Sequence, residues 1–235
     1  MLYTLNFEKI LFLDIETVPM VEHYDLLPER FRLLWDKKCE FLRKDEDETP
    51  DVLFKRAGIY AEFGKIICIS TGFFAKDQFR IKSFYGEDEL DLLKGFAGLL
   101  EGYFCKPGYM LCAHNGKEFD YPYIARRMLI NGLNLPSVIN MAGKKPWEVP
   151  HLDTLELWKF GDYKSYTSLD LLTAVFGIPT PKGDIDGSMV GEVFYKEKDL
   201  ARIVKYCERD TLAVAQLLCS YTGKPLIKDE LVTIV

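Results

Sequence analysis

The sequence predicts a single α/β domain, because segments typical of strands alternate with segments typical of helices along one span. Two apolar runs, residues 10–13 and 109–113, are nearly continuous, as in strands that are covered on both faces within a sheet. A length of 235 residues corresponds to one large domain or two small ones, and no linker is long or flexible enough to require two. We therefore expect one domain, residues 1–235.

The first expected strand, residues 8–16, is followed by a helical insertion, residues 21–62. Apolar side chains recur there at roughly helical spacing, until the acidic run at 45–48 breaks the pattern. Residues 65–75 and 78–86 then read as two strands joined by a short Lys-Asp turn. Together with the first strand, this hairpin predicts a meander.

The second half of the chain alternates helical patterns with one more buried strand. The helix expected over 87–104 is amphipathic, and its apolar side consists of Leu90, Leu93, Phe96, Leu100 and Tyr103. The elements expected after it are a strand over 109–115, a helix over 119–133, a loop over 136–150, a short element opening at 152–153, and helices over 168–176 and 197–220.

The composition is that of a globular protein. Hydrophobic residues make up 48% and aromatic residues 14%, which excludes disorder and fibrous repeats. No apolar run exceeds five residues, so no segment is expected to span a bilayer, and the N-terminal residues lack the features of a secretion signal. Six cysteines without a C-x-x-C pair predict neither disulfides nor a zinc site, and favour a reducing compartment, the cytoplasm.

The net charge of −6 argues against a nucleic-acid partner, because a surface that binds phosphates is expected to be basic. The local motifs point the other way.

Three places along the chain carry acids that could do chemistry. Asp14 and Glu16, two apart at the end of a buried strand, leave the same face of the sheet, although two solvated acids beyond a finished strand would look the same. Asp120 lies at the start of a helix, where a carboxylate also complements the helix dipole. Tyr206 and Asp210 share one helix face beside its apolar stripe, where a packing residue next to a solvated charge is the simpler interpretation. The hypothesis of an active site depends on their conjunction.

Taken in order, D-I-E, N-G-x-x-F-D and Y-x-x-x-D resemble the motifs of the DEDD superfamily of 3′–5′ exonucleases. The tyrosine before the last acid is typical of the DEDDy branch, whereas the DEDDh branch has a histidine where this chain has Lys205. The chain looks similar to the proofreading exonuclease domain of B-family DNA polymerases and to related stand-alone predicted exonucleases. The resemblance runs from about residue 8 to 220, and residues 182–190 also resemble the stand-alone group. It implies a ribonuclease H-like fold, with a central mixed sheet flanked by helices.

The resemblance implies that four carboxylates hold two divalent cations, Mg²⁺ or Mn²⁺: Asp14, Glu16, Asp120 and Asp210. Tyr206 would orient the attacking water, since a phenol with a pKa of about 10 is a poor base at neutral pH. The substrate contacts that it implies are Thr17, Asn115, Phe119 and Lys182. Asp153 is either an acid behind the metal ligands or the cap of the next helix, and the cap is favoured.

The leading hypothesis is therefore a metal-dependent 3′–5′ exonuclease that releases nucleoside monophosphates from single-stranded DNA. The same chemistry on RNA is the nearest alternative, because no motif reads a 2′-hydroxyl. A non-catalytic nucleic-acid-binding module of the same fold is a third interpretation, although such a module would usually have lost a metal ligand. The overall acidity further predicts that the protein binds the nucleic-acid strand weakly outside the cleft, and hence that it acts distributively.

Overall fold

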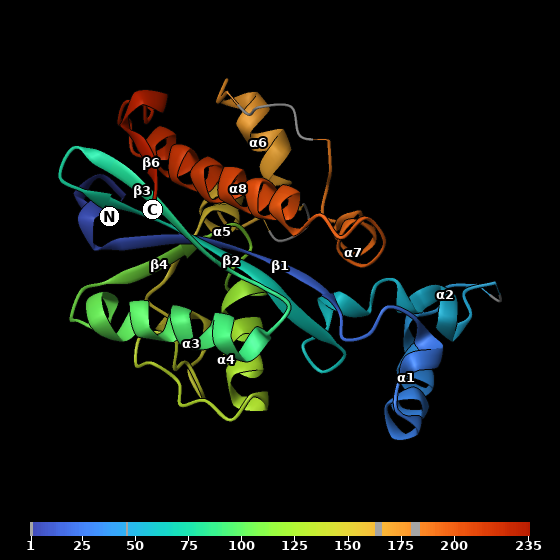
Figure 1. The fold of residues 1–235 in the computed structure, drawn as a ribbon. Coiled ribbons are helices and arrows are strands. Elements are labelled where there is room, and N and C mark those ends of the chain that lie inside the picture. Colours follow the sequence, from blue (N-terminus) through green and yellow to red (C-terminus); the bar gives the residue numbers. More distant parts are fainter. Residues whose placement is uncertain (1, 46, 163–165, 180–183) are drawn as a thin grey trace.

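A six-stranded mixed sheet lies between two layers of helices (Figure 1). The computed structural model describes residues 2–45, 47–162, 166–179 and 184–235. The strands are β1 (Ile10–Pro19), β2 (Gly64–Ala75), β3 (Gln78–Tyr85), β4 (Met110–Ala113), β5 (Leu152–Asp153) and β6 (Val232–Ile234). Their order is β5-β4-β1-β2-β3-β6, with β1, β2 and β3 antiparallel and the other neighbours parallel. The predicted α/β class, mixed sheet and meander are confirmed.

The helices are α1 (Glu29–Leu42), α2 (Pro50–Phe54), α3 (Glu89–Leu99), α4 (Asp120–Ile130), α5 (Thr154–Lys159), α6 (Leu169–Val175), α7 (Val190–Glu192) and α8 (Leu200–Tyr221). α3 and α4 cover one face of the sheet and α8 covers the other, whereas α1 and α2 lie beyond its end (Figure 1). Successive side chains of a strand point to opposite faces, so β1 contributes to two cores. Leu11 and Leu13 pack with α3 and α4, whereas Ile10 and Phe12 pack with α8. The predicted position of β1, covered on both faces, is therefore confirmed.

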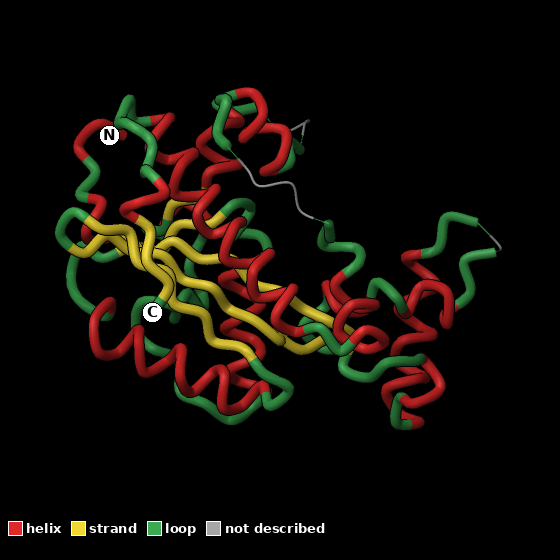
Figure 2. The backbone as a smooth tube through the Cα atoms, turned by 45° about the horizontal axis from the view of Figure 1, so that its top comes forward, coloured by secondary structure: helices red, strands yellow, loops and turns green. Residues whose placement is uncertain are grey.

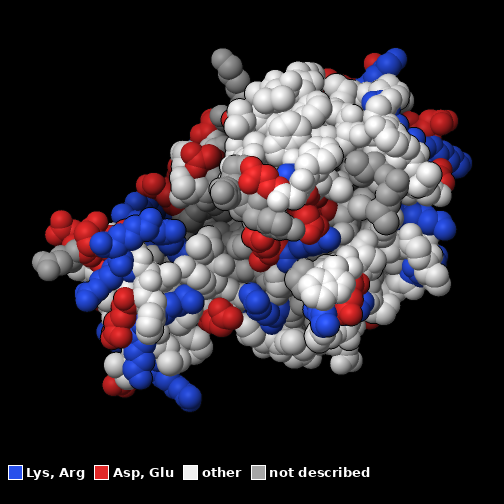
Figure 3. All heavy atoms as spheres, turned by 180° about the vertical axis from the view of Figure 1, so that it is seen from behind, with Lys and Arg blue, Asp and Glu red and all other residues white. Residues whose placement is uncertain are grey.

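The helical insertion predicted over residues 21–62 is confirmed, and it has a small core of its own beyond the end of the sheet (Figure 2). Trp35 is fully buried there, and its Nε1 donates a hydrogen bond to the Pro50 carbonyl oxygen at 2.8 Å. The rings of Phe54 and Phe63 meet the Trp35 ring edge-on. Figure 3 shows Lys and Arg side chains gathered on the surface of this insertion.

The amphipathic helix expected over 87–104 is shorter than predicted. The α-helix ends at Leu99 and continues as a π-helical turn over Leu100–Phe104, in which the Cys105 N–H donates to the Leu100 carbonyl at 2.9 Å. This wider turn changes the angle between successive side chains, and Tyr103 is 65% exposed. The placement of Tyr103 on the apolar side was therefore wrong.

Other boundaries differ from the predictions by a few residues. The last long helix begins at Leu200 rather than residue 197, because Asp199 caps it by accepting a hydrogen bond from the Arg202 N–H at 3.0 Å. The short parallel strand β6 was not predicted. Within the described residues, no helix is long and apolar enough to cross a membrane.

A buried ion pair joins α3 to α4 beneath the sheet. The Glu89 carboxylate accepts hydrogen bonds from Arg127 Nε at 2.8 Å and from the Ile66 N–H at 2.7 Å, and both charged side chains are at least nine-tenths buried. Arg127 also donates to the Ala61 carbonyl at 2.8 Å, at the base of the insertion. The pair thus ties both helices and the insertion to the start of β2.

We expect Arg127→Met to lower the free energy of unfolding by about 3–5 kcal/mol, because it leaves the Glu89 carboxylate buried without its cation. The matched control is Lys196→Met, which breaks an exposed pair with Glu192 and should cost less than about 1 kcal/mol. Urea unfolding of both variants measures the difference. Similar losses would contradict a structural role for the buried pair.

Candidate active site

The face of β1 that meets α8 changes from apolar to acidic halfway along the strand. Ile10 and Phe12 are core residues on this face, and Asp14 and Glu16 continue the same alternation. Glu16 is buried and Asp14 is half-buried. The register with β2 shifts between Glu16 and Thr17, an irregularity of the kind that redirects side chains next to active sites.

Asp120 reaches the same place from the start of α4. β4 pairs with β1 only along residues 10–12, so it ends before the level of Asp14. α4 begins just beyond that end with Asp120, whose buried carboxylate lies near the backbone of Ile15. A short strand followed by a helix start therefore places a third acid beside β1.

Asp153 holds the loop that leads to Asp120. Its Oδ1 accepts from the Asn115 N–H at 2.9 Å and its Oδ2 from the Lys117 N–H at 3.0 Å. Oδ1 also accepts from the Leu155 N–H at 2.9 Å, which caps α5. The predicted cap is confirmed, and the same side chain fixes the turn in which Asn115 adopts a φ of 61°.

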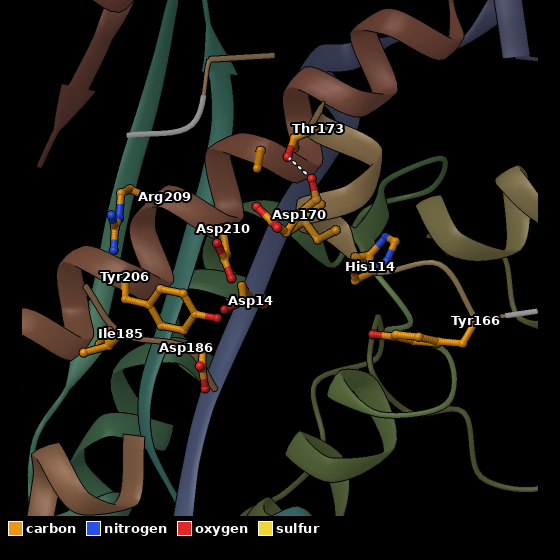
Figure 4. Close-up of a pocket in the computed structure, with 13 residues that line it drawn as sticks. Asp14, His114, Tyr166, Asp170, Thr173, Ile185, Asp186, Tyr206, Arg209 and Asp210 are labelled. Atoms are coloured by element: carbon orange, nitrogen blue, oxygen red, sulfur yellow. Dashed lines mark hydrogen bonds between the residues drawn. The ribbon is translucent and has the colours of Figure 1, made fainter. Parts of the chain in front are cut away.

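α8 supplies the remaining two candidates. Tyr206 and Asp210 lie one turn apart on the same face of the helix, and both line the same cavity. Figure 4 shows both side chains converging with Asp14. The helix is held in register on the sheet, because Cys207 Sγ donates to the Asp14 carbonyl at 3.3 Å and Thr211 Oγ1 to the Ser70 carbonyl at 3.2 Å.

Two cavities meet at Asp14, Tyr206 and Asp210. The first, of about 640 Å³, lies between α8, α6 and the segment around Tyr166, and His114 and Arg209 also line it (Figure 4).

The second cavity, of about 340 Å³, runs past Glu16 and Thr17 to Phe119 and ends at the insertion, where Lys55 and Arg56 line it. Residues 185–191 border both cavities: Ile185 and Asp186 line the first, and Gly187, Ser188 and Gly191 line the second. Asp14 and Asp210 therefore lie where the two cavities meet, whereas Glu16 lines only the second cavity and Asp120 lines neither.

The structure places most of the predicted site residues at this junction. Thr17 and Phe119 line the second cavity with Glu16, whereas Asn115 lines neither cavity. Lys182 lies outside the described residues.

Three basic residues that line the cavities were not predicted from the sequence: Lys55, Arg56 and Arg209. Arg209 is next to Asp210 in the sequence, which is a usable signal, but nothing in the motifs points to the basic pair in the insertion.

Residues 59–223 match the family described as "Predicted 3′–5′ exonuclease related to the exonuclease domain of PolB". The chain belongs to this family. The matched residues include Asp120, Tyr206 and Asp210, but they begin after Asp14, Glu16 and most of the insertion. No curated protein matches the sequence.

The fold of this predicted 3′–5′ exonuclease is that of the ribonuclease H-like exonuclease domains. It is similar to the structure of the family B DNA polymerase from the hyperthermophilic archaeon Pyrobaculum calidifontis, with a TM-score of 0.52 and 16% sequence identity. The similarity covers 90% of this chain and 24% of the polymerase. This similarity shows the fold. It also covers most of the residues that lie outside the family match.

The carboxylates of the exonuclease are crowded and partly desolvated. Burial raises the pKa values of Asp14 and Glu16 well above the usual range, and nearby carboxylates raise them further. Burial likewise raises the pKa of Asp120 to about 7 and that of Asp210 to about 6. The four acids cannot all be charged at neutral pH without a compensating positive charge.

The donor atoms of this group fit a hard divalent cation. Ligand atoms of Asp14, Glu16 and Cys207 lie within 4.8 Å of one another. Burial raises the pKa of the Cys207 thiol, so the thiol keeps its proton and donates it in a hydrogen bond to the Asp14 carbonyl. The anionic donors are therefore carboxylate oxygens. Oxygen donors are those that Mg²⁺ and Mn²⁺ prefer.

These pKa values predict a pH dependence of stability. Asp120 keeps its proton in the folded chain up to about pH 7 but loses it near pH 4 in the unfolded chain, so its contribution to the free energy of unfolding falls as the pH rises between them. His151, whose pKa burial lowers to about 4, acts in the opposite direction below pH 6.5. The informative quantity is therefore the difference between the wild type and a variant.

We expect Asp120→Asn to gain stability relative to the wild type as the pH rises from 5 to 8 in the presence of EDTA, by on the order of a few kcal/mol. Urea unfolding at several pH values measures this gain. Mn²⁺ should raise the unfolding midpoint of the wild type at pH 8 and raise that of Asp120→Asn much less. A difference that does not change with pH would contradict the raised pKa.

Proposed function

We propose that the protein is a DEDDy-type 3′–5′ exonuclease that hydrolyses phosphodiester bonds at the 3′ end of single-stranded DNA and releases nucleoside monophosphates. The observation that carries the proposal is the convergence of Asp14, Tyr206 and Asp210 at the junction of two cavities, with the buried Glu16 and Asp120 beside them. The family match supports the reaction class. A cytoplasmic location, expected from the cysteine pattern, belongs to the same proposal.

Asp14, Glu16, Asp120 and Asp210 would hold two divalent cations, Mg²⁺ or Mn²⁺. When bound, such ions supply a water activated for attack and stabilisation of the leaving 3′ oxygen. The protein contributes the placement. β1, α4 and α8 each bring at least one acid, and the Asp14 carbonyl and the Asp153 carboxylate hold α8 and the loop before α4 in place.

Tyr206 would orient the attacking water by hydrogen bonding and would not act as a base. Burial and the neighbouring carboxylates raise the pKa of its hydroxyl well above the usual value, so the proton stays on the phenol oxygen. The hydroxyl oxygen can still accept a hydrogen bond from a water in the cavities.

The nucleotide next to the scissile phosphate would occupy the second cavity. Its volume of about 340 Å³ is at the lower end of the range for small-molecule sites, which suits a single nucleotide. Thr17 and Phe119 line it, and the Phe119 ring packs against Tyr123 at a centroid distance of 5.3 Å, which restrains it for stacking on a base. Substrate contacts by Asn115 and Lys182 remain predictions.

Cleavage of oligonucleotides labelled at the 5′ end, with Mg²⁺ or Mn²⁺, tests activity, direction and substrate together. We expect a ladder of products that shorten from the 3′ end of single-stranded DNA. Asp210→Asn should slow the reaction at least about a hundredfold, because a cation ligand is worth several kcal/mol in the transition state. Asp91→Asn, at an exposed acid outside both cavities, is the control.

Two outcomes of this assay would replace the proposal. Faster cleavage of matched RNA would assign RNA as the substrate class. Binding without cleavage of any strand, unchanged by Asp14→Asn except in affinity, would indicate a non-catalytic nucleic-acid-binding module.

Tyr206→Phe separates orientation from packing. Because the phenyl ring remains and only the hydroxyl is lost, we expect kcat to fall by about a hundredfold while KM changes less than about twofold. Tyr103→Phe removes an exposed hydroxyl as the control. A proportional loss in binding and turnover would indicate a packing role for Tyr206.

A further inference from the structure

The helical insertion forms one wall of the second cavity, facing the acidic end of β1. Glu16 and Thr17 line the cavity from β1, Phe119 lines it from the residue before α4, and Lys55 and Arg56 line it from the insertion. The cavity is therefore acidic on one side and basic on the other. The basic residues precede residue 59, where the family match begins.

The two basic side chains are available to a ligand. Both are exposed, and neither forms an ion pair or a side-chain hydrogen bond with a described residue. By contrast, Lys117 pairs with Glu156 elsewhere on the surface. Two basic side chains that line a cavity and have no acidic partner among the described residues can bind an anionic ligand.

The backbone that carries them is fixed to the nuclease core. Lys55 ends α2, and the next turn, Ala57–Ile59, passes so close to β1 that a Cβ on Gly58 would lie 2.9 Å from the Val18 carbonyl carbon. The Tyr123 hydroxyl donates to the Gly58 carbonyl at 2.6 Å, which ties this turn to α4. The basic pair is therefore held at a set distance from the carboxylates.

We infer that Lys55 and Arg56 form a phosphate-binding site for the substrate strand, on the far side of the second cavity from the carboxylates. This inference rests on the proposed function, and the ligand is the phosphate backbone of a single strand at the nucleotides nearest the 3′ end. The insertion thereby supplies the positive charge that the rest of the second cavity's lining lacks. The basic pair counteracts the repulsion between the strand and the acids, and it fixes the position of the 3′-terminal nucleotide relative to the carboxylates.

The first test is the double variant Lys55→Gln/Arg56→Gln. Its matched control is Lys37→Gln/Lys44→Gln, which removes the same charge from exposed positions of the same insertion that line neither cavity. Fluorescence anisotropy with a single-stranded DNA oligonucleotide in Ca²⁺ measures affinity, and cleavage in Mg²⁺ or Mn²⁺ measures KM and kcat.

We expect the cavity variant to bind about tenfold more weakly at low salt, with a salt slope less steep by about 1.4, because each phosphate contact to a single strand contributes about 0.7. KM should rise accordingly while kcat stays within about twofold of the wild type. The control variant should keep the wild-type slope and KM. Equal effects in the two variants, or none in either, would overturn the inference.

The second test locates the contact on the strand. Oligonucleotides with one neutral methylphosphonate at successive positions from the 3′ end should show one or two positions where neutralisation weakens binding to the wild type. At those positions the cavity variant should be insensitive, because the interaction is already lost. If the variant stays as sensitive as the wild type at every position, Lys55 and Arg56 do not bind phosphate. Failure of the wild type to cleave any strand would instead refute the proposed function.

Discussion

The main constraint on this structure is the repulsion among the carboxylates that gather at one short stretch of β1. Asp14 and Glu16 occupy the face on which Ile10 and Phe12 are core, and Asp120 and Asp210 are brought against them from two helices. Such an arrangement is unfavourable in isolation, since each buried acid raises the pKa of its neighbours. It persists because apolar packing elsewhere along β1 and α8 holds these elements together.

Besides this apolar packing, polar links between elements resist the repulsion. Thr211 and Cys207 bond α8 to backbone carbonyls of the sheet, and Asp153 bonds the loop before α4. On the other side of α8, Glu208 accepts from Ser83 Oγ at 2.8 Å. Each link fixes the position of an acid without neutralising it. The carboxylate oxygens are therefore left for cations, whose binding would displace the protons that burial keeps on them.

A net charge of −6 is compatible with a nucleic-acid substrate, because the charge near the cavities differs from the average over the chain. Acids concentrate where cations are proposed to bind, so the local sign reverses when they do. Basic side chains such as Lys55, Arg56 and Arg209 line the cavities around that centre. A whole-chain charge averages these regions and does not describe the potential that a strand meets.

Much of the fold could be predicted because its elements are long and strongly periodic. The β2–β3 hairpin and α8 were expected within a few residues of their observed bounds. Tyr103 was misplaced because a π-helical turn follows Leu99, and such a turn depends on packing more than on local sequence. β6 has only three residues, too few for a periodic pattern, and exists through its pairing with β3.

By itself, the sequence determined the class of the fold and the motif acids, because residue type and spacing along one element decide which side chains share a face. Only the tertiary structure decided what surrounds those acids. Asp120 reaches β1 because β4 ends early, and Lys55 and Arg56 face the acids because Gly58 lets the insertion pass directly over β1. Both depend on contacts between segments far apart in the chain, which no local pattern encodes.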